Sequence, residues 1–212
     1  MSERYFVTIA GNVGVGKSTL TQLLAERLGW TPVYEAVDDN PFIADFFADM
    51  RRWSFHSQLF FLSRRIRSHR EMTSHPQPII QDRSIYEDAN IFARNLYERG
   101  NMTPREFEVY RSFYEEFIQI LPTPNLIVYL KASVPTLIER VHRRGRDYEK
   151  HISPLYLQQL NELYNAWSED FTLCPILTIP TDELDFVRFE NHFERVTAQI
   201  MSWLQANNQV YA

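Results

Sequence analysis

Residues 11–18 read Gly11-Asn12-Val13-Gly14-Val15-Gly16-Lys17-Ser18, a full match to the phosphate-binding pattern GxxxxGK[ST]. An apolar run at 5–10 precedes the match and an amphipathic stretch at 17–28 follows it, so the pattern lies between a strand and a helix, as it must. Glycines let backbone N–H groups turn around a phosphate, and the positive end of the following helix strengthens the local field. We therefore expect a nucleotide to be held by residues from Gly11 to Thr19.

Two side chains of this motif have chemical roles of their own. Lys17 is expected to reach the β- and γ-phosphates, and the Ser18 hydroxyl is expected to ligate Mg²⁺. The alternative is a glycine-rich turn that only joins a strand to a helix, which does not account for a lysine and a serine at these offsets. A phosphate loop by itself does not distinguish a kinase from a GTPase, a motor or a regulatory switch.

Outside the motif, short apolar runs alternate with longer amphipathic stretches, a pattern typical of a parallel sheet covered by helices on both faces. The predicted strands are 5–10, 31–34, 78–81, 125–130 and 175–179. The predicted helices are 17–28, 53–72, a helix capped by Thr103, a helix from Ser133 to near Gly145, 154–170 and 188–205. No repeat or linker divides the chain, so we expect one domain over residues 1–212.

Composition limits the class of protein. With 212 residues and 44% hydrophobic content, the chain can fill one sizeable core. A net charge of −5 disfavours non-specific binding to nucleic acid or to an anionic membrane surface. Cys174 is the single cysteine, which fits a reducing compartment, and no segment is typical of a signal peptide or a membrane span. We therefore expect a cytoplasmic protein with no nucleic-acid or membrane partner.

Three further motifs occur in the order of a known family. They are Glu35 after the second strand, Gln81-Asp82-Arg83-Ser84 after the third strand, and Arg-Arg-Gly-Arg at 143–146. With the phosphate loop, these motifs resemble the deoxynucleoside kinase family, and the run Val37-Asp38-Asp39-Asn40-Pro41 resembles its bacterial deoxyadenosine and deoxyguanosine kinase branch. The resemblance implies a P-loop NTPase fold with a five-stranded parallel sheet, Mg-ATP as phosphoryl donor, a deoxynucleoside 5′-hydroxyl as acceptor, and a homodimer built on helices.

The resemblance also assigns the reacting groups. Glu35 matches the carboxylate that takes the proton from the 5′-hydroxyl, and Arg83 matches the arginine that holds this carboxylate and the phosphoryl oxygens. Asp82 occupies a position where the family often has Glu, and we expect it to contact Mg²⁺ or a water molecule. Outside this family, a glutamate before a loop is usually a solvated turn residue.

The segment at about 140–150 resembles the lid over the triphosphate. The resemblance assigns Arg140, Arg144 and Arg146 to the transferring phosphate, whose negative charge planar guanidinium groups stabilise. Asp185 and Phe186 follow the last strand, where the family holds the adenine of ATP by stacking and backbone contacts. Without the resemblance, these arginines would be a basic helix end that complements the helix dipole.

Four residues match the positions that bind the nucleobase. Gln58 offers a donor and an acceptor side by side, which suits adenine or cytosine and, after a flip, guanine or thymine. Arg65 and Asp88 match a charged pair on the far side of the base, and Phe92 matches an aromatic that stacks on it. We expect purine deoxynucleosides to be preferred, adenine first, with deoxycytidine tolerated and thymidine poor.

Two residues match the positions that bind the sugar. Glu149 matches the carboxylate for the 3′-hydroxyl, and its usual tyrosine partner is replaced here by Phe47. The phenolic hydrogen bond is therefore absent, which weakens the expected demand for a 3′-hydroxyl by about 0.5–1.5 kcal/mol.

Three rival functions remain at this level. A nucleoside monophosphate kinase of the thymidylate type also has a phosphate loop and an Asp-Arg pair after a strand, but it needs no general base. A nucleotide-binding switch would bind without turnover. Nucleic-acid binding by the basic and aromatic segment 53–70 is disfavoured by the acidic net charge.

Overall fold

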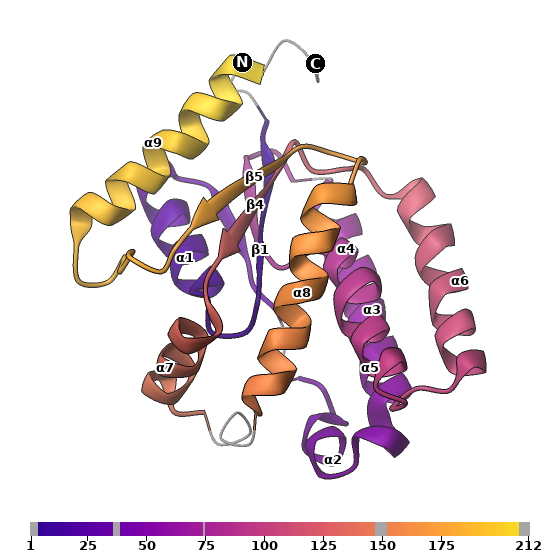
Figure 1. The fold of residues 1–212 in the computed structure, drawn as a ribbon. Helices are drawn as coiled ribbons and strands as arrows, with labels where there is room; N and C mark the ends of the chain where they lie inside the picture. Colours follow the sequence, from indigo (N-terminus) through magenta and orange to yellow (C-terminus); the bar gives the residue numbers. More distant parts are fainter. Residues whose placement is uncertain (1–3, 36–38, 74, 147–151, 208–212) are drawn as a thin grey trace.

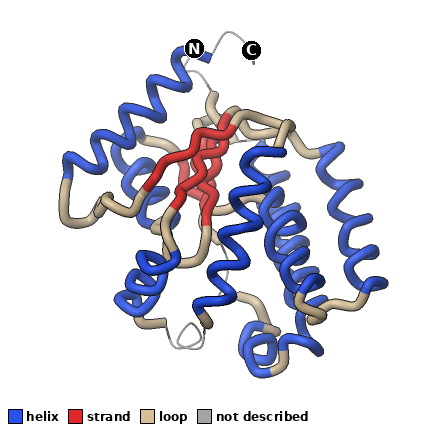
Figure 2. The backbone as a smooth tube through the Cα atoms, in the orientation of Figure 1, coloured by secondary structure: helices blue, strands red, loops and turns tan. Residues whose placement is uncertain are grey.

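A five-stranded parallel sheet forms the centre of the molecule, with the strand order β2-β3-β1-β4-β5 (Figures 1 and 2). The computed structural model describes residues 4–35, 39–73, 75–146 and 152–207. The strands are β1 Phe6–Gly11, β2 Thr31–Val33, β3 Ile79–Asp82, β4 Leu126–Lys131 and β5 Ile176–Pro180. The prediction of this sheet is confirmed, although four strands lie one residue later than the apolar runs suggested and β2 ends at Val33.

Helices connect and cover the strands (Figure 1). They are α1 Lys17–Leu28, α2 Ile43–Ala48, α3 Met50–Thr73, α4 Ile85–Glu87, the π-helix η1 Asp88–Ala93, α5 Arg94–Glu98, α6 Pro104–Ile120, α7 Val134–Arg144, α8 Pro154–Asp170 and α9 Glu190–Asn207. Local chemistry explains several ends: Thr103 and Glu106 form a capping box before α6, and left-handed Gly29 and Gly145 close α1 and α7.

The two faces of the sheet carry separate hydrophobic cores because successive strand side chains point in opposite directions. Val128 faces one core, which also contains residues of α1 and α9. Ile127 and Tyr129 face the other, which contains residues of α3, α6 and α8. The single cysteine, Cys174, is buried in this second core. Both sheet faces are therefore covered, which explains why the strands are almost uniformly apolar.

The segments after the strands meet at one edge of the sheet, because all five strands run in the same direction. The phosphate loop follows β1, Glu35 lies just beyond β2, and Asp82 ends β3. Gly11 is required at the end of β1, since a Cβ there would lie 2.6 Å from the Leu130 carbonyl oxygen of β4. The fold thus delivers three chemically active segments to one place.

Two parts of the chain were not predicted from its pattern. One is the short helix α2, and the other is the run α4, η1 and α5, in which a π-helix lies between two short α-helices. Across the residues that the structure describes, no helix has the length and apolar character needed to cross a membrane.

Candidate active site

Two neighbouring cavities open at the phosphate loop. The first has a volume of about 330 Å³ and the second about 440 Å³. Both are lined by Gly14, Lys17, Ser18, Arg144 and Arg146. The two cavities therefore meet at the residues that would hold a terminal phosphate, so groups bound on the two sides would face each other there.

The phosphate loop is fixed to its surroundings by Asn12. The Asn12 amide nitrogen donates to Leu157 O at 2.9 Å and to Asn161 Oδ1 at 2.7 Å, which ties the loop to α8, while Asn12 Oδ1 accepts from Val13 N at 2.7 Å. Gly14 has a φ of +84°, and a Cβ there would come within 2.7 Å of Val141 Cγ2. The glycine is needed because both the backbone conformation and the close approach of α7 exclude a side chain.

Lys17 lies within this loop with its ammonium group buried. Its Nζ donates to Gly11 O at 2.8 Å and to Asn12 O at 3.0 Å. Burial lowers the pKa of Lys17 to about 8, with Arg83 adding to the fall and the nearby carboxylates opposing it. A negatively charged phosphate beside Lys17 would favour the protonated form.

Ser18 and Asp82 form a pair of oxygen ligands at the junction. The Ser18 hydroxyl donates to Asp82 Oδ2, and the other oxygen, Oδ1, is buried with no hydrogen-bond partner among the described residues. Hydroxyl and carboxylate oxygens suit Mg²⁺, which is usually held by one or two protein groups together with phosphates and water. The residues therefore fit this ion.

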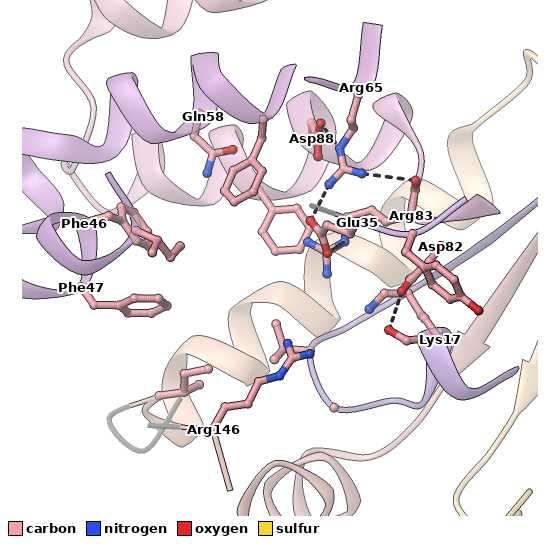
Figure 3. A pocket seen from close by; sticks show the side chains of 18 of the residues that line it. Lys17, Glu35, Phe46, Phe47, Gln58, Arg65, Asp82, Arg83, Asp88 and Arg146 are labelled. Carbon is pink, nitrogen blue, oxygen red and sulfur yellow. Dashed lines mark hydrogen bonds and ion pairs between the residues drawn. The ribbon is translucent and has the colours of Figure 1, made fainter. Parts of the chain in front are cut away.

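A network of buried charges forms the wall opposite the loop (Figure 3). Arg65 Nη2 donates to Glu35 Oε1 at 2.6 Å, and Arg65 Nε donates to Asp88. Arg83 Nε lies 3.4 Å from Glu35 Oε2 in an ion pair, and the Arg83 carbonyl accepts from Arg65 Nη1 at 3.2 Å. The pairing of Arg65 with Asp88 was expected from the sequence, whereas the bond from Arg65 to Glu35 was not.

The charges in this network set the protonation of its carboxyl groups. Burial alone would raise the pKa of Glu35, but Arg83 and Arg65 outweigh it and lower that pKa to about 2. Burial raises the pKa of Asp88 to about 7, because Arg65 opposes the rise only in part and Glu35 adds to it. Glu35 is thus ionised at neutral pH, and Arg65 divides its charge between two carboxyl groups.

The backbone at Arg83 is held in a left-handed conformation with a φ of +66°, the only such residue other than glycine in the described part of the chain. Strained conformations of this kind cost of order 1–3 kcal/mol and occur preferentially at functional sites. The conformation turns the guanidinium toward Glu35 and over the ring of Phe92, whose centroid lies 4.1 Å from Arg83 Cζ.

The end of the first cavity away from Lys17 is apolar with one amide. Figure 3 shows Phe46, Phe47 and Gln58 on one side of the cavity and Lys17 and Asp82 on the other, with Glu35 and Arg83 between them. Gln58 is buried and lines this end of the cavity. An aromatic pocket with a single amide suits a flat heterocycle with donors and acceptors on one edge.

The arginines of α7, and Arg146 just beyond its end, have different surroundings. Arg140 donates from Nη1 to Val15 O at 3.0 Å and from Nη2 to Thr181 O at 2.6 Å and Leu184 O at 2.9 Å. This side chain therefore ties the phosphate loop to the segment after β5, and it also lines the second cavity, so its expected contact with a triphosphate stays a prediction. Arg144 and Arg146 line both cavities, and Arg146 points toward the charged network in Figure 3.

The two residues expected to hold the donor base line the second cavity but also have structural contacts. Phe186 is buried, and its ring lies 3.8 Å from the position of a Cβ built on Gly16. Asp185 Oδ1 accepts from Val187 N at 3.0 Å and from Arg188 N at 3.1 Å, closing the turn before α9. Phe186, in the segment after β5, thus packs against Gly16 of the phosphate loop.

Most of the residues that the sequence nominated line the two cavities, as set out above. Glu149 lies outside the described residues. Sequence reasoning missed Phe46, Tyr156 and Glu87, of which the first two line the first cavity. Glu87 is fully buried behind the phosphate loop, and the spacing Ser84-x-x-Glu87, a capping box, was the available signal.

Comparison with known proteins places this geometry in context. A family model described as "Deoxynucleoside kinase" matches residues 7–205. The chain is 36% identical over 205 residues to the deoxyadenosine/deoxycytidine kinase of Bacillus subtilis, covering 96% of this chain and 94% of that protein. It is 35% identical over 208 residues to the deoxyguanosine kinase of the same organism, covering 94% and 98%.

Solved structures give the same result. The deoxyadenosine kinase from M. mycoides, solved with the products dCMP and a flexible dCDP, has a TM-score of 0.82 at 27% identity and covers 93% of this chain and 99% of that one. A structure of the same enzyme with bound dATP also has a TM-score of 0.82, at 26% identity and the same coverage.

Proposed function

The chain belongs to the deoxynucleoside kinase family, and from this premise we propose that Glu35, Arg83 and Lys17 transfer the γ-phosphate of ATP to a deoxynucleoside 5′-hydroxyl. The enzyme is a deoxynucleoside kinase with ATP as its phosphoryl donor. The observation that supports the residue assignment is the junction of the two cavities: Glu35 and Arg83 line the first, and Lys17 and Ser18 line both.

In the proposed reaction the 5′-oxygen forms a bond to the γ-phosphorus, the bond to the bridging oxygen breaks, and ADP leaves with the electron pair. Glu35 accepts the 5′ proton through Oε2, since Oε1 already accepts a short bond from Arg65 whereas Oε2 has only the longer contact with Arg83. A carboxylate with a pKa of about 2 is a weak base, so the proton leaves the 5′-oxygen late. Phosphoryl transfer tolerates this, because its transition state is loose and depends mainly on positioning and charge.

The cations on both sides of the junction stabilise the charge that develops. Lys17 neutralises the β- and γ-phosphates from the loop, Arg83 lies on the acceptor side, and Arg144 and Arg146 line both cavities. Ser18 and Asp82 would hold Mg²⁺, and the ion would supply Lewis-acid stabilisation of the phosphoryl group. Arg140 supports the phosphate loop through its bonds to Val15 O and Thr181 O, and it lines the second cavity, where the triphosphate would lie.

The first cavity would take the deoxynucleoside. We propose that Gln58 pairs with the edge of the base, that Phe46, Phe47 and Phe92 surround its rings, and that the Arg65–Asp88 pair bonds its far side. A charged pair here favours a purine or cytosine over thymine, whose methyl group would desolvate it. The relatives that act on deoxyadenosine, deoxycytidine and deoxyguanosine support this choice.

We propose a homodimer that buries the outer face of α6. Val109, Phe113 and Ile120 lie along one side of this helix and are 46%, 48% and 73% exposed. Large apolar side chains exposed along one side of a helix favour an interface with another chain. We also propose a cytoplasmic location, consistent with one buried thiol and no second cysteine in the sequence.

The test is a phosphorylation panel with Mg-ATP across the four deoxynucleosides and their 5′-monophosphates, repeated with Glu35→Gln. We expect deoxyadenosine to be the best acceptor and thymidine the poorest. Glu35→Gln should lower kcat by about 10²- to 10⁴-fold, with little change in the KM for ATP. Phosphorylation of a monophosphate that survives Glu35→Gln would instead indicate a nucleoside monophosphate kinase, and nucleotide binding without turnover would indicate a switch.

A further inference from the structure

Glu87 is a fully buried carboxylate that bonds to three different segments. Its Oε1 accepts from the backbone N–H of Gly11, at the start of the phosphate loop, at 3.2 Å. The same oxygen accepts from the Tyr164 hydroxyl of α8 at 2.7 Å. Its Oε2 accepts from the backbone N–H of Ser84 at 2.9 Å. One side chain thus joins the phosphate loop, α8 and the turn that follows Arg83.

Helix capping accounts for only one of these three bonds. In a capping box the glutamate needs one oxygen to reach the backbone N–H of the capping residue, and Oε2 does this for Ser84. Glu106 has the same role at the start of α6, where it accepts from Thr103 N at 2.8 Å on the protein surface. The contacts of Glu87 Oε1 have no such explanation, because neither Gly11 nor Tyr164 belongs to α4.

The bond from Ser84 N to Glu87 helps to hold the strained backbone of Arg83, the residue before Ser84. Arg83 has a left-handed backbone, which persists only where neighbouring contacts hold it. The Ser84 N–H is the first backbone donor after that residue, and Glu87 holds it. The carboxylate therefore fixes the Arg83 turn and the first N–H of the phosphate loop to one another.

Tyr164 connects Glu87 to the charged network around Glu35 and Arg83. Its ring meets the ring of Phe92 edge-on at 6.3 Å between centroids, and Phe92 lies beneath the Arg83 guanidinium at 4.1 Å. On its other side, Tyr164 stacks on Tyr129 of β4 at 5.6 Å. Glu87 and Tyr164 together are thus packed between the phosphate loop and the residue that holds Glu35.

The charge of Glu87 also requires nearby cations. A buried carboxylate is costly unless it is hydrogen-bonded and paired. Its hydrogen bonds are those above; burial lowers the pKa of Lys17, and the negative charge of Glu87 opposes this fall, as it does at Arg83. The two cations that flank the γ-phosphate in the proposed reaction therefore share this buried anion.

We propose that Glu87, held by Tyr164, is a positioning residue for phosphoryl transfer that fixes the phosphate loop at Gly11 relative to the Arg83 turn. This inference rests on the proposed function, because it says that a residue touching neither substrate sets the distance between the groups that bind the donor and those that bind the acceptor. Errors of about 1 Å in such a distance cost about 10²-fold in rate.

The experiment compares wild type, Glu87→Gln and Glu106→Gln with saturating deoxyadenosine and Mg-ATP. Glutamine keeps the size of the side chain and one acceptor oxygen but removes the charge and the second acceptor. We expect Glu87→Gln to lower kcat by about 10- to 100-fold while each KM changes less than about threefold. Glu106→Gln, which alters a capping box far from the cavities, should lower Tm slightly and leave kcat unchanged.

The split between kcat and KM is the readout that a purely structural role would not move. Per folded enzyme, misplaced donor and acceptor groups lower kcat while both substrates still bind, so each KM stays close to the wild-type value. Glu106→Gln should change neither quantity.

Tyr164→Phe keeps the test decisive if Glu87→Gln fails to fold. It removes one hydroxyl and retains the ring contacts, so we expect a loss of about three- to tenfold in kcat, and no further loss when it is added to Glu87→Gln. The proposal is overturned if Glu87→Gln, or Tyr164→Phe where the former does not fold, has a kcat within twofold of wild type. An inactive wild type in the same assay would instead overturn the proposed function.

Discussion

At the scale of single residues, the buried network of charges in the first cavity depends on Arg65, because this side chain bonds to both Glu35 and Asp88. One positive charge cannot fully compensate two buried carboxylates. Arg83 supplies a second charge to Glu35, so Asp88 is the less compensated of the two; burial raises the pKa of Asp88, and Arg65 offsets that rise only in part. The imbalance leads to a prediction about pH.

Asp88→Asn should gain stability relative to wild type as the pH rises. The pKa of Asp88 is raised from 3.8 to about 7, so its contribution to stability is fully present below the lower value and is lost as the pH rises through about 7. Asparagine does not titrate, and its amide oxygen can still accept from Arg65. We expect the difference in free energy of unfolding to shift toward the variant by on the order of 1–3 kcal/mol between pH 5 and 8.

Urea denaturation at pH 5, 6, 7 and 8 measures this shift. Asp45→Asn, at an exposed position on α2, serves as the control, and its curve should remain parallel to that of wild type. Parallel curves for Asp88→Asn as well would contradict the role given to Arg65.

Phe47→Tyr should make the enzyme more demanding for the sugar 3′-hydroxyl. The phenolic oxygen would restore a hydrogen bond worth about 0.5–1.5 kcal/mol, which is roughly a two- to tenfold effect. The measurement is kcat/KM for 2′,3′-dideoxyadenosine relative to deoxyadenosine in both proteins. An equal penalty in wild type and variant would reject the prediction.

The sequence identified individual site residues where a motif surrounds them and failed where it does not. Lys17, Asp82 and Arg83 belong to short patterns at strand ends, and the structure brings them together in the first cavity. Glu87 and Tyr164 are far apart in the chain and meet only through tertiary packing. The double use of Arg65 could not be foreseen either, since spacing along a helix does not reveal a second partner on another segment.

At the scale of elements, α7 supports the phosphate loop through Arg140, which bonds Val15, Thr181 and Leu184. Arg140→Lys should loosen this support, because an ammonium group cannot reproduce the fork of donors. We expect the KM for ATP to rise about tenfold and Tm to fall by several degrees, since three or more hydrogen bonds of about 0.5–1.5 kcal/mol are at stake.

The adjacent Arg143 provides a matched control. Its side chain is half exposed and lies 3.8 Å from Asp185, so Arg143→Lys should change both quantities little. Steady-state kinetics and thermal unfolding of the two variants decide the matter. Equal effects, or none in Arg140→Lys, would contradict a supporting role for Arg140.

Long periodic elements were predictable and short ones were not. Helices α1 and α8 have the predicted bounds, because glycine closes the first and the Ser153-Pro154 pair opens the second. The six-residue helix α2 is too short to show a period, and the π-helix η1 depends on packing around Asp88 and Phe92. Two of the unpredicted elements, α2 and η1, contribute residues to the first cavity.

At the scale of the whole molecule, the outer face of α6 determines the proposed assembly. Placing glutamate at Phe113 and Ile120 should prevent association, because buried charges without partners are strongly unfavourable in an interface. We expect wild type to have the mass of a dimer and Phe113→Glu/Ile120→Glu that of a monomer in light scattering. Val187→Glu, at an apolar residue that is 77% exposed outside α6, should remain dimeric. A monomeric wild type would contradict the dimer.

The parallel sheet and the edge that carries the site could be predicted because the strand, helix and motif patterns in the sequence agreed with one another. Apolar runs gave the strands, their alternation with helices gave a parallel sheet, and the phosphate loop fixed which edge carries the site. Strand order and the contacts between distant segments did not follow, since many orders satisfy the same pattern.

The solitary thiol of Cys174 makes the protein convenient for spectroscopy. It is buried in the second core, and burial raises its pKa to about 12, so almost no reactive thiolate is present at neutral pH. A maleimide dye should therefore not react with Cys174 and should attach only to cysteines introduced at exposed positions. Dyes placed at Asp49 before α3 and at Arg143 on α7 would report how the distance between these two sides of the cavities changes during turnover.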